Sequence, residues 1–103
     1  MRIEWTAPAE TDLEEIFDYI ARDAPVYAEH YIDRIIDAVS ALHEHPQLGR
    51  VVHEAGREHI RELIHQSHRI IYALRADRIH ILAIIHGRRD LESLPDKPWD
   101  SES

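Results

Sequence analysis

Cysteine is absent from this chain of 103 residues, and Lys, Met and Phe occur only once each. Without cysteine the chain has no disulfide, no thiol nucleophile and no thiolate ligand for a metal. Long apolar runs are also missing, since no segment approaches the roughly 20 apolar residues that span a bilayer. Glu4 and Pro8 stand where a signal peptide needs an apolar core. We therefore expect a cytoplasmic protein without membrane contact.

Positive charge is scarce in the first half of the chain. The formal net charge is −8, from 20 acidic and 12 basic residues. Residues 1–45 carry −8, residues 46–94 carry +2, and residues 95–103 carry −2. Phosphate attraction supplies most non-specific affinity for nucleic acids, so the field of the whole molecule opposes direct binding of DNA or RNA. Only the second half offers a local basic face.

Two apolar runs separated by a short polar break organise the second half. Residues 68–74 and 78–86 are rich in Ile, Leu and Tyr, and residues 75–77 are polar, which predicts a strand, a tight turn and a second strand. The second run is apolar on both alternating faces. One face would carry Ile79, Ile81, Ala83 and Ile85, and the other Leu82 and Ile84. Such a strand needs cover on both faces and should lie inside its sheet.

The first half predicts one strand and two helices. Residues 2–6 alternate polar and apolar side chains, as a strand does. Thr6 is suited to cap a helix that runs to about Arg22. Residues 23–25 break this helix, and a second helix follows to about His43. The positions predicted to lie in the core of the first helix are Ala9, Leu13, Ile16, Phe17 and Ile20.

These elements together predict the α+β class. Residues 59–65 form another strand before the run at 68–74, and Val51-Val52 is at most a short extended piece. The expected fold is an N-terminal strand, an antiparallel helix hairpin and a three-stranded antiparallel meander, which form one twisted sheet of four strands with the hairpin on one face. The first strand should pair with the long last one. We expect a single domain over residues 1–94 and a flexible acidic tail over residues 95–103. The tail is mostly polar, and Trp99 is the exception.

The strongest candidate for a functional site is the cationic turn His86-Gly87-Arg88-Arg89, which follows the last strand. Gly87 allows a sharp change of direction, and the two guanidinium groups offer planar forks for phosphate or carboxylate. The alternative is a solvated strand end, in which one of the arginines pairs with a neighbouring acid.

Three residues on the preceding strands are further candidates. Arg69 and Tyr72 lie three positions apart on one strand, so they should point to opposite faces. They are either a salt-bridged Arg and a core Tyr, or contacts for a target or an inhibitor. Arg61 on the strand before them either shares a face with Arg69 or is a charge at the rim.

Nine histidines raise the question of a metal site. His43 and His45 are two positions apart near a helix end, so they do not share a helical face. The His-Glu-x-x-His ligand motif is missing, and neither Ser40 nor Ser67 stands in a catalytic-triad motif. We therefore expect no metal and no cofactor.

An ordered set of short segments covers residues 2 to about 90. They are Ile3-Glu4-Trp5-Thr6 with Ala9 and Asp12-Leu13, Ile16 with Tyr19-Ile20, Pro46-Gln47-Leu48-Gly49-Arg50, Arg61-Glu62-Leu63, His68-Arg69-Ile70-Ile71-Tyr72, and Ile84-Ile85-His86-Gly87-Arg88-Arg89. No single segment is specific, but in this order the chain resembles the RelE/ParE toxins of bacterial type II toxin–antitoxin (plasmid stabilisation) systems. The resemblance implies a twisted antiparallel sheet with a helix hairpin, in agreement with the fold predicted from the pattern.

The resemblance also implies one of two activities. RelE-like toxins enter the ribosome and cut mRNA, using basic residues and often a C-terminal Tyr, whereas ParE-like toxins poison DNA gyrase. Here no Tyr follows Tyr72, the only lysine is Lys97 in the tail, and Glu62 stands where a nuclease would gain from a cation. The ParE-like branch is therefore favoured, and the residues predicted to bind the target are Arg69, His86, Arg88 and Arg89.

Two alternatives stay open. The first is a ribosome-dependent mRNA endonuclease, in which arginines stabilise charge and His68 or His86 moves protons; its catalytic residues would be Arg61, Arg69, His86 and Arg88. The second is an inactive member that only binds. In every case the resemblance implies a cognate antitoxin, with DNA reached only indirectly through it. Apolar residues left over on the hairpin and Trp99 are the candidate antitoxin contacts.

Overall fold

One mixed sheet of five strands organises the protein, in the order β1-β5-β4-β3-β2. The computed structural model describes residues 1–100. The strands are β1 (Arg2–Trp5), β2 (Arg50–Val51), β3 (Ile60–His65), β4 (His68–Leu74) and β5 (Arg78–His86). The helices are α1 (Ala7–Ala21) and α2 (Pro25–Ser40), and three short 3-10 turns are η1 (Ala41–His43), η2 (His53–Ala55) and η3 (Leu91–Ser93). The predicted α+β order, with the meander β3–β4–β5, is confirmed.

The sheet has one strand more than the sequence predicts. Residues 50–51 pair antiparallel with β3 and form β2, which is too short to show an alternating pattern. At the other end β1 pairs with β5 in parallel, with Ile3 opposite Ile79. The predicted pairing of the first strand with the last is therefore confirmed, and β5 lies between two neighbours.

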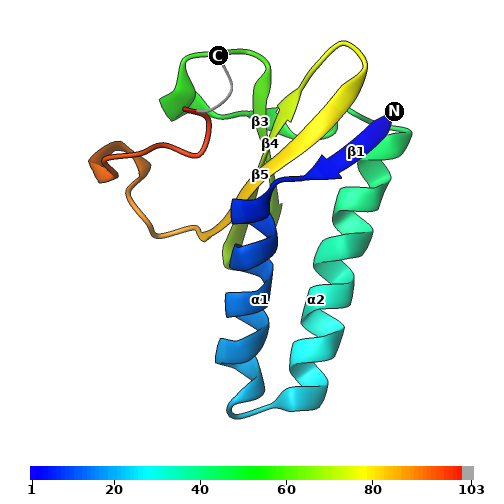
Figure 1. The fold of residues 1–103 in the computed structure, drawn as a ribbon, viewed down its shortest axis with the longest axis vertical. Coiled ribbons are helices and arrows are strands. Elements are labelled where there is room, and N and C mark those ends of the chain that lie inside the picture. The colour runs from blue at the N-terminus through cyan, green and yellow to red at the C-terminus, as the bar shows by residue number, and fades with distance from the viewer. Residues whose placement is uncertain (101–103) are drawn as a thin grey trace.

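Thr6 sets the start of the helix hairpin and ties it to the sheet. Its hydroxyl accepts a hydrogen bond from the backbone N–H of Ala9 (3.3 Å) and donates one to the carbonyl of Ile81 on β5 (2.8 Å). Pro8 and Pro25 stand in the first turns of α1 and α2, where no intrahelical donor is lost. The two helices run side by side, and their far ends extend beyond the sheet (Figure 1).

Two apolar clusters form the core. The cluster that joins α2 to the sheet has the buried members Ala9, Tyr31, Ile35, Val39, Leu42, Ile70, Tyr72, Ile79, Ile81 and Ile84. The second cluster joins the sheet to η3 and the C-terminal segment, and its buried members are Val52, Ile60, Ile71, Ala73, Leu82, Ala83, Ile85, Leu91 and Trp99. Both apolar faces of β5 are therefore covered, as burial of apolar area requires.

The C-terminal segment differs from the flexible tail expected from residue 95. Trp99 is only 5% exposed and packs in the second cluster. Lys97 Nζ donates a hydrogen bond to the carbonyl of Glu92 (3.1 Å), which holds the segment close to η3. The large indole covers apolar area of the sheet, and this burial outweighs the polar character of its neighbours. Residues 101–103 of the expected tail lie outside the described part of the chain.

The faces of β5 also differ from simple alternation. Tyr72 on β4 pairs with Ile81, whereas Ile71 pairs with Ala83, so Leu82 is an extra residue and β5 contains a bulge. The bulge shifts the pattern, and Ile84 packs with Ile81 in the cluster under the helices. The predicted grouping of Ala83 with Ile81 is therefore wrong, because a bulge depends on pairing with a neighbouring strand.

Gly49 lies where only a hydrogen atom fits. Its N–H donates to the hydroxyl of Tyr72 (2.9 Å), and that hydroxyl donates to the carbonyl of Pro46 (2.9 Å). A Cβ at Gly49 would lie 2.6 Å from the carbonyl oxygen of Glu62 and 2.6 Å from the Tyr72 hydroxyl. Tyr72 is fully buried, so neither group can move aside easily.

We expect Gly49→Ala to lower the free energy of unfolding by about 2–3 kcal/mol, because the added methyl group overpacks a rigid site. Urea denaturation followed by circular dichroism measures the change. Gly56→Ala is the matched control, because a Cβ there meets nothing within 4 Å and only its left-handed backbone (φ +63°) opposes the substitution. The control should lose about 1 kcal/mol. Equal losses in both variants would contradict the steric argument.

Candidate functional site

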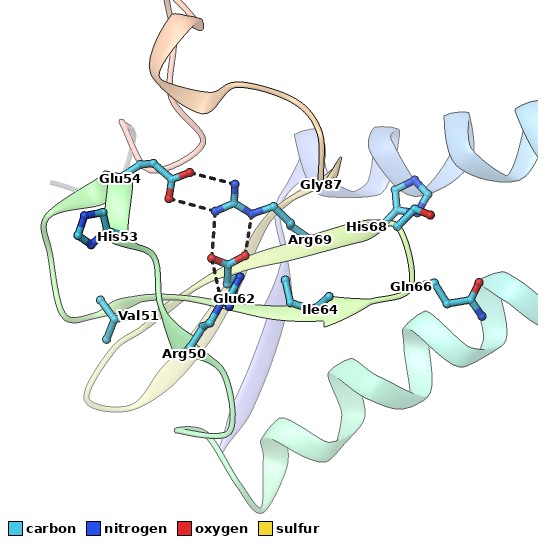
Figure 2. A pocket seen from close by; sticks show the side chains of 11 residues that line it. Arg50, Val51, His53, Glu54, Glu62, Ile64, Gln66, His68, Arg69 and Gly87 are labelled. Atoms are coloured by element: carbon cyan, nitrogen blue, oxygen red, sulfur yellow. Dashed lines mark hydrogen bonds and ion pairs between the residues drawn. The ribbon is translucent and has the colours of Figure 1, made fainter.

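Arg69 on β4 lies at the centre of a buried ion-pair network. Its Nε and Nη2 donate to the two carboxylate oxygens of Glu62 (2.7 and 3.0 Å), and Nη1 and Nη2 donate to those of Glu54 (3.0 and 3.2 Å). Figure 2 shows the guanidinium group held between the two carboxylates. The hydrogen bonds that Arg69 donates to Glu62, the largest effect, raise the pKa of Arg69, and the hydrogen bonds that Arg69 donates to Glu54 lower the pKa of Glu54.

This network leaves little free positive charge on this face of the sheet. Two carboxylates surround Arg69, whose side chain is only 11% exposed. The exposed Arg50 adds a second cation, with its Nε 3.6 Å from Glu62. The local charge is therefore balanced, and the donors of Arg69 already have acceptors. Glu62 could be recognised in the sequence, but Glu54 could not, because η2 has no pattern that would predict its approach to β4.

Arg61 lies on the other face of β3. Its Nη1 donates to the carbonyl of Gly49 (2.8 Å), so Arg61 holds the loop that precedes β2. Glu62, the next residue on β3, points to the opposite face of the sheet. Arg69 lies on that face too, because it donates a hydrogen bond to Glu62. The structure therefore does not bring Arg61 and Arg69 together.

The cationic turn that follows β5 is exposed throughout, from His86 to Arg89. The N–H of Gly87 donates to the carbonyl of Ser67 (2.6 Å), and the N–H of Arg89 donates to the carbonyl of His86 (3.0 Å). The backbone N–H of Arg88 donates to Nδ1 of His86 (3.2 Å). Within residues 1–100 neither Arg88 nor Arg89 has a carboxylate within ion-pair distance. The backbone of this turn is therefore fixed, and neither guanidinium group is in an ion pair with a described carboxylate. Arg89 still lowers the pKa of Asp12, against the larger effect of burial, which raises it.

An aromatic groove leads from this turn along the helix hairpin. Tyr31 on α2 hydrogen-bonds through its hydroxyl to Nδ1 of His68 (2.6 Å), and the ring of His68 lies edge-on to that of His86 (5.6 Å between centroids). Tyr19 and Tyr27 line the same groove and are 72% and 46% exposed. The sequence signal for this groove was the four-residue spacing of Tyr27 and Tyr31, which places both on one side of α2.

Residues 3–91 match the profile of the family described as ParE toxin of type II toxin-antitoxin system, parDE. The chain belongs to the ParE toxin family. The predicted resemblance, including its ParE-like side, is confirmed.

A curated protein and a solved structure are also similar to this chain. "Putative toxin Y4kP" of Sinorhizobium fredii is 38% identical over 90 residues, which cover 85% of this chain and 90% of that protein. A solved structure described as the chromosomal ParDE TA system from P. aeruginosa superposes with a TM-score of 0.71, at 22% identity, over 84% of this chain and 95% of that one. The second similarity shows that the two chains share a fold.

The described residues of this ParE-family chain also bear on metal binding and on membrane insertion. Within residues 1–100 no group of three or more His, Asp or Glu side chains is arranged to hold a metal ion. None of the helices described here is long and apolar enough to cross a membrane.

We expect His68 to make the stability of this ParE-family chain depend on pH. Burial, the largest effect, and the neighbouring His86 and His65 lower the pKa of His68 from its ordinary value of 6.5. Below pH 6.5 the unfolded chain therefore binds this proton before the folded chain does. The free energy of unfolding should fall as pH drops from 6.5 to the lower folded pKa, and the contribution of His68 should be constant above pH 6.5.

Urea denaturation between pH 7.5 and 5.5 measures this dependence. We expect His68→Asn to flatten the profile, because asparagine has no proton to gain in this range. The exposed His30 lies on α2 outside this cluster, and His30→Asn is the matched control. A profile for His68→Asn as steep as that of the natural chain would refute the role of His68.

Proposed function

We propose that this ParE-family chain arrests growth by binding and poisoning DNA gyrase, with the cationic turn His86–Arg89 as the main contact and a cognate antitoxin as its inhibitor. The observation that carries the proposal is the distribution of free cations. Arg69 is neutralised by Glu54 and Glu62, whereas Arg88 and Arg89 are exposed and have no ion pair within residues 1–100. They lie beside a groove lined by tyrosines and by the carboxylates of Asp12, Glu15 and Asp18. Such a site suits a protein surface that bears carboxylates and apolar side chains.

The alternative of an mRNA endonuclease has weaker support. Cleavage of a phosphodiester requires charge stabilisation, an acid and a base at one place. Of its four candidate residues, Arg61 holds a loop on the other face of the sheet, and the donors of Arg69 are taken up by two carboxylates. His86 and Arg88 alone would have to supply the acid, the base and the charge. Arg69, also predicted to bind the target, is better explained as a structural residue of the sheet.

The antitoxin contacts are proposed on the helix hairpin. Tyr19, Val26 and Tyr27 are exposed there, and a partner that covers them would remove apolar area from water. Trp99 no longer belongs among the candidates, because its side chain packs in the core. We further propose that the chain acts in the cytoplasm, and that DNA is reached only through the antitoxin.

Inducible expression of the chain in a bacterium tests the proposal, with growth, mRNA integrity and supercoiling of a reporter plasmid followed together. Growth arrest with altered supercoiling and intact mRNA is the expected result. Purified chain should also trap gyrase on cleaved plasmid DNA. Arrest with translation-dependent mRNA cuts would replace gyrase with the ribosome, and no arrest together with no effect on purified gyrase would favour a member that only binds.

A further inference from the structure

The last part of β5 has a strand on only one side. β1 pairs with the start of β5, whereas β4 pairs with β5 as far as His86. Beyond the end of β1, helix α1 lies along the open side of β5 (Figure 1). Two side chains take the place of a neighbouring strand there. The hydroxyl of Thr6 donates to the carbonyl of Ile81 (2.8 Å), and Oδ2 of Asp12 accepts from the N–H of Ile84 (3.0 Å). Backbone groups of a sheet edge are thus satisfied from a helix.

Asp12 acts on the chain on both sides of the cationic turn. Ile84, its hydrogen-bond donor, lies two residues before His86. Arg89 closes the turn, because its N–H donates to the carbonyl of His86 (3.0 Å) and brings the chain back beside the end of β5. The side chains of Asp12 and Arg89 line the aromatic groove together, and they also line a second cleft between α1, β5 and the C-terminal segment.

The charge of Asp12 needs an explanation of its own. The side chain is half-buried, and burial, the largest effect, raises its pKa because a carboxylate is less stable there than in water. An asparagine could accept the hydrogen bond of Ile84 without this loss of hydration. The charge therefore points to a cationic partner. Arg89 is the arginine whose charge lowers the pKa of Asp12.

We propose that Asp12 is a positioning residue for the cationic turn. Its hydrogen bond with Ile84 fixes the end of β5 from which the turn starts, and its charge attracts the side chain of Arg89 towards the groove. From the β4 side the carbonyl of Ser67 accepts from the N–H of Gly87 (2.6 Å), so the turn is held between α1 and the β3–β4 hairpin. The inference rests on the proposed function only for the target, because the link between Asp12 and the turn is a property of the chain alone.

NMR titration of the Asp12 carboxyl group tests this link without a target. Arg89→Ala should raise the pKa of Asp12 further, because a neighbouring positive charge is lost. Arg88→Ala is the matched control and should leave that pKa unchanged. An unchanged pKa of Asp12 in Arg89→Ala, or equal shifts in both variants, would overturn the proposal.

Hydrogen exchange of the Ile84 amide tests the anchor. Asp12→Ala should speed this exchange by about tenfold or more, because the N–H loses its acceptor. Asp12→Asn should leave the amide protected, since its side-chain oxygen still accepts. Exchange that is unchanged in Asp12→Ala contradicts the anchor and the proposal with it.

A double-mutant cycle separates positioning of Arg89 from structural damage. Asp12→Asn should trap purified gyrase on cleaved plasmid about tenfold more weakly, although the Ile84 amide stays protected. In the Arg89→Ala background the same substitution should have no further effect, because Asp12 acts through Arg89. An equal loss in both backgrounds would show a purely structural role, and tighter trapping by Asp12→Asn would show competition for Arg89. Either result overturns the proposal.

Glu14→Gln is the matched control for the loss of one negative charge on α1. Glu14 is exposed on another flank of the helix, beside Phe17, which is half-buried and not in the core as predicted. The control should change trapping by less than about twofold. If the natural chain traps no gyrase, the proposed function fails, and the pKa and exchange measurements still decide whether Asp12 positions the turn.

Discussion

Glu62→Gln should lower the free energy of unfolding by about 3–5 kcal/mol, because it removes one partner of a buried ion pair. The Glu62 side chain is 3% exposed and accepts two hydrogen bonds from Arg69. An amide has one oxygen and one NH2 group, so it can accept only one of them, and its NH2 group would face the guanidinium. A chain of this size is stable by only about 5–15 kcal/mol, so the loss is a large fraction of the total. The midpoint of thermal unfolding should fall by about 12–20 °C.

Two companion variants separate the charge pair from general damage to the core. Glu54→Gln, whose side chain is 25% exposed, should lose less, about 1–2 kcal/mol, because water can replace part of its contact. Glu62→Leu/Arg69→Met, which removes the buried pair and leaves the partly exposed Glu54 to water, should recover much of the stability lost in Glu62→Gln. If the double variant is less stable than Glu62→Gln, the loss in Glu62→Gln does not come from leaving the charge of Arg69 without its partner, and this explanation fails.

Arg88→Ala/Arg89→Ala should abolish growth arrest. Both side chains are exposed and free of ion pairs with the described residues, so their removal leaves the fold intact and removes the charge proposed to meet gyrase. A loss of about 2 kcal/mol for each contact corresponds to roughly a thousandfold weaker binding. Colony counts under induction and trapping of purified gyrase on cleaved plasmid measure the effect.

Arg34→Ala is the control for the loss of an exposed arginine, since Arg34 lies on α2 away from the cationic turn. It should arrest growth as the natural chain does, and circular dichroism should show that all variants are folded. Full arrest by Arg88→Ala/Arg89→Ala at equal protein levels would exclude the cationic turn as the target contact.

The elements with strong local signals could be predicted from the sequence. The apolar runs at 68–74 and 78–86 gave both bounds of β4 and β5, because polar residues end each run sharply. Thr6 predicted the start of α1, and the break at residues 23–25 predicted the start of α2, because both signals are local. β2 could not be found, because a strand of two residues exists only through its pairing with β3.

The candidate site was predictable only in part, because its chemistry depends on contacts between distant segments. The cationic turn follows directly from the end of an apolar strand, and its exposure is as expected. Whether Arg69 is free or neutralised depends on the register of β3 against β4 and on where η2 places Glu54. The bulge at Leu82 likewise arises from pairing, and it decides which side chains of β5 face the helices.

The parallel pairing of β1 with β5 has a consequence for how the protein is made. Within residues 1–100, β1 is the first strand in chain order, and its one sheet neighbour is β5, the last. Contacts between residues so far apart in sequence form late and slowly in folding. A chain that ends before residue 78 lacks the neighbour of β1, the carbonyl that anchors Thr6 and the cationic turn. Translation products interrupted before residue 78 should therefore neither complete the sheet nor act through the turn proposed to contact the target.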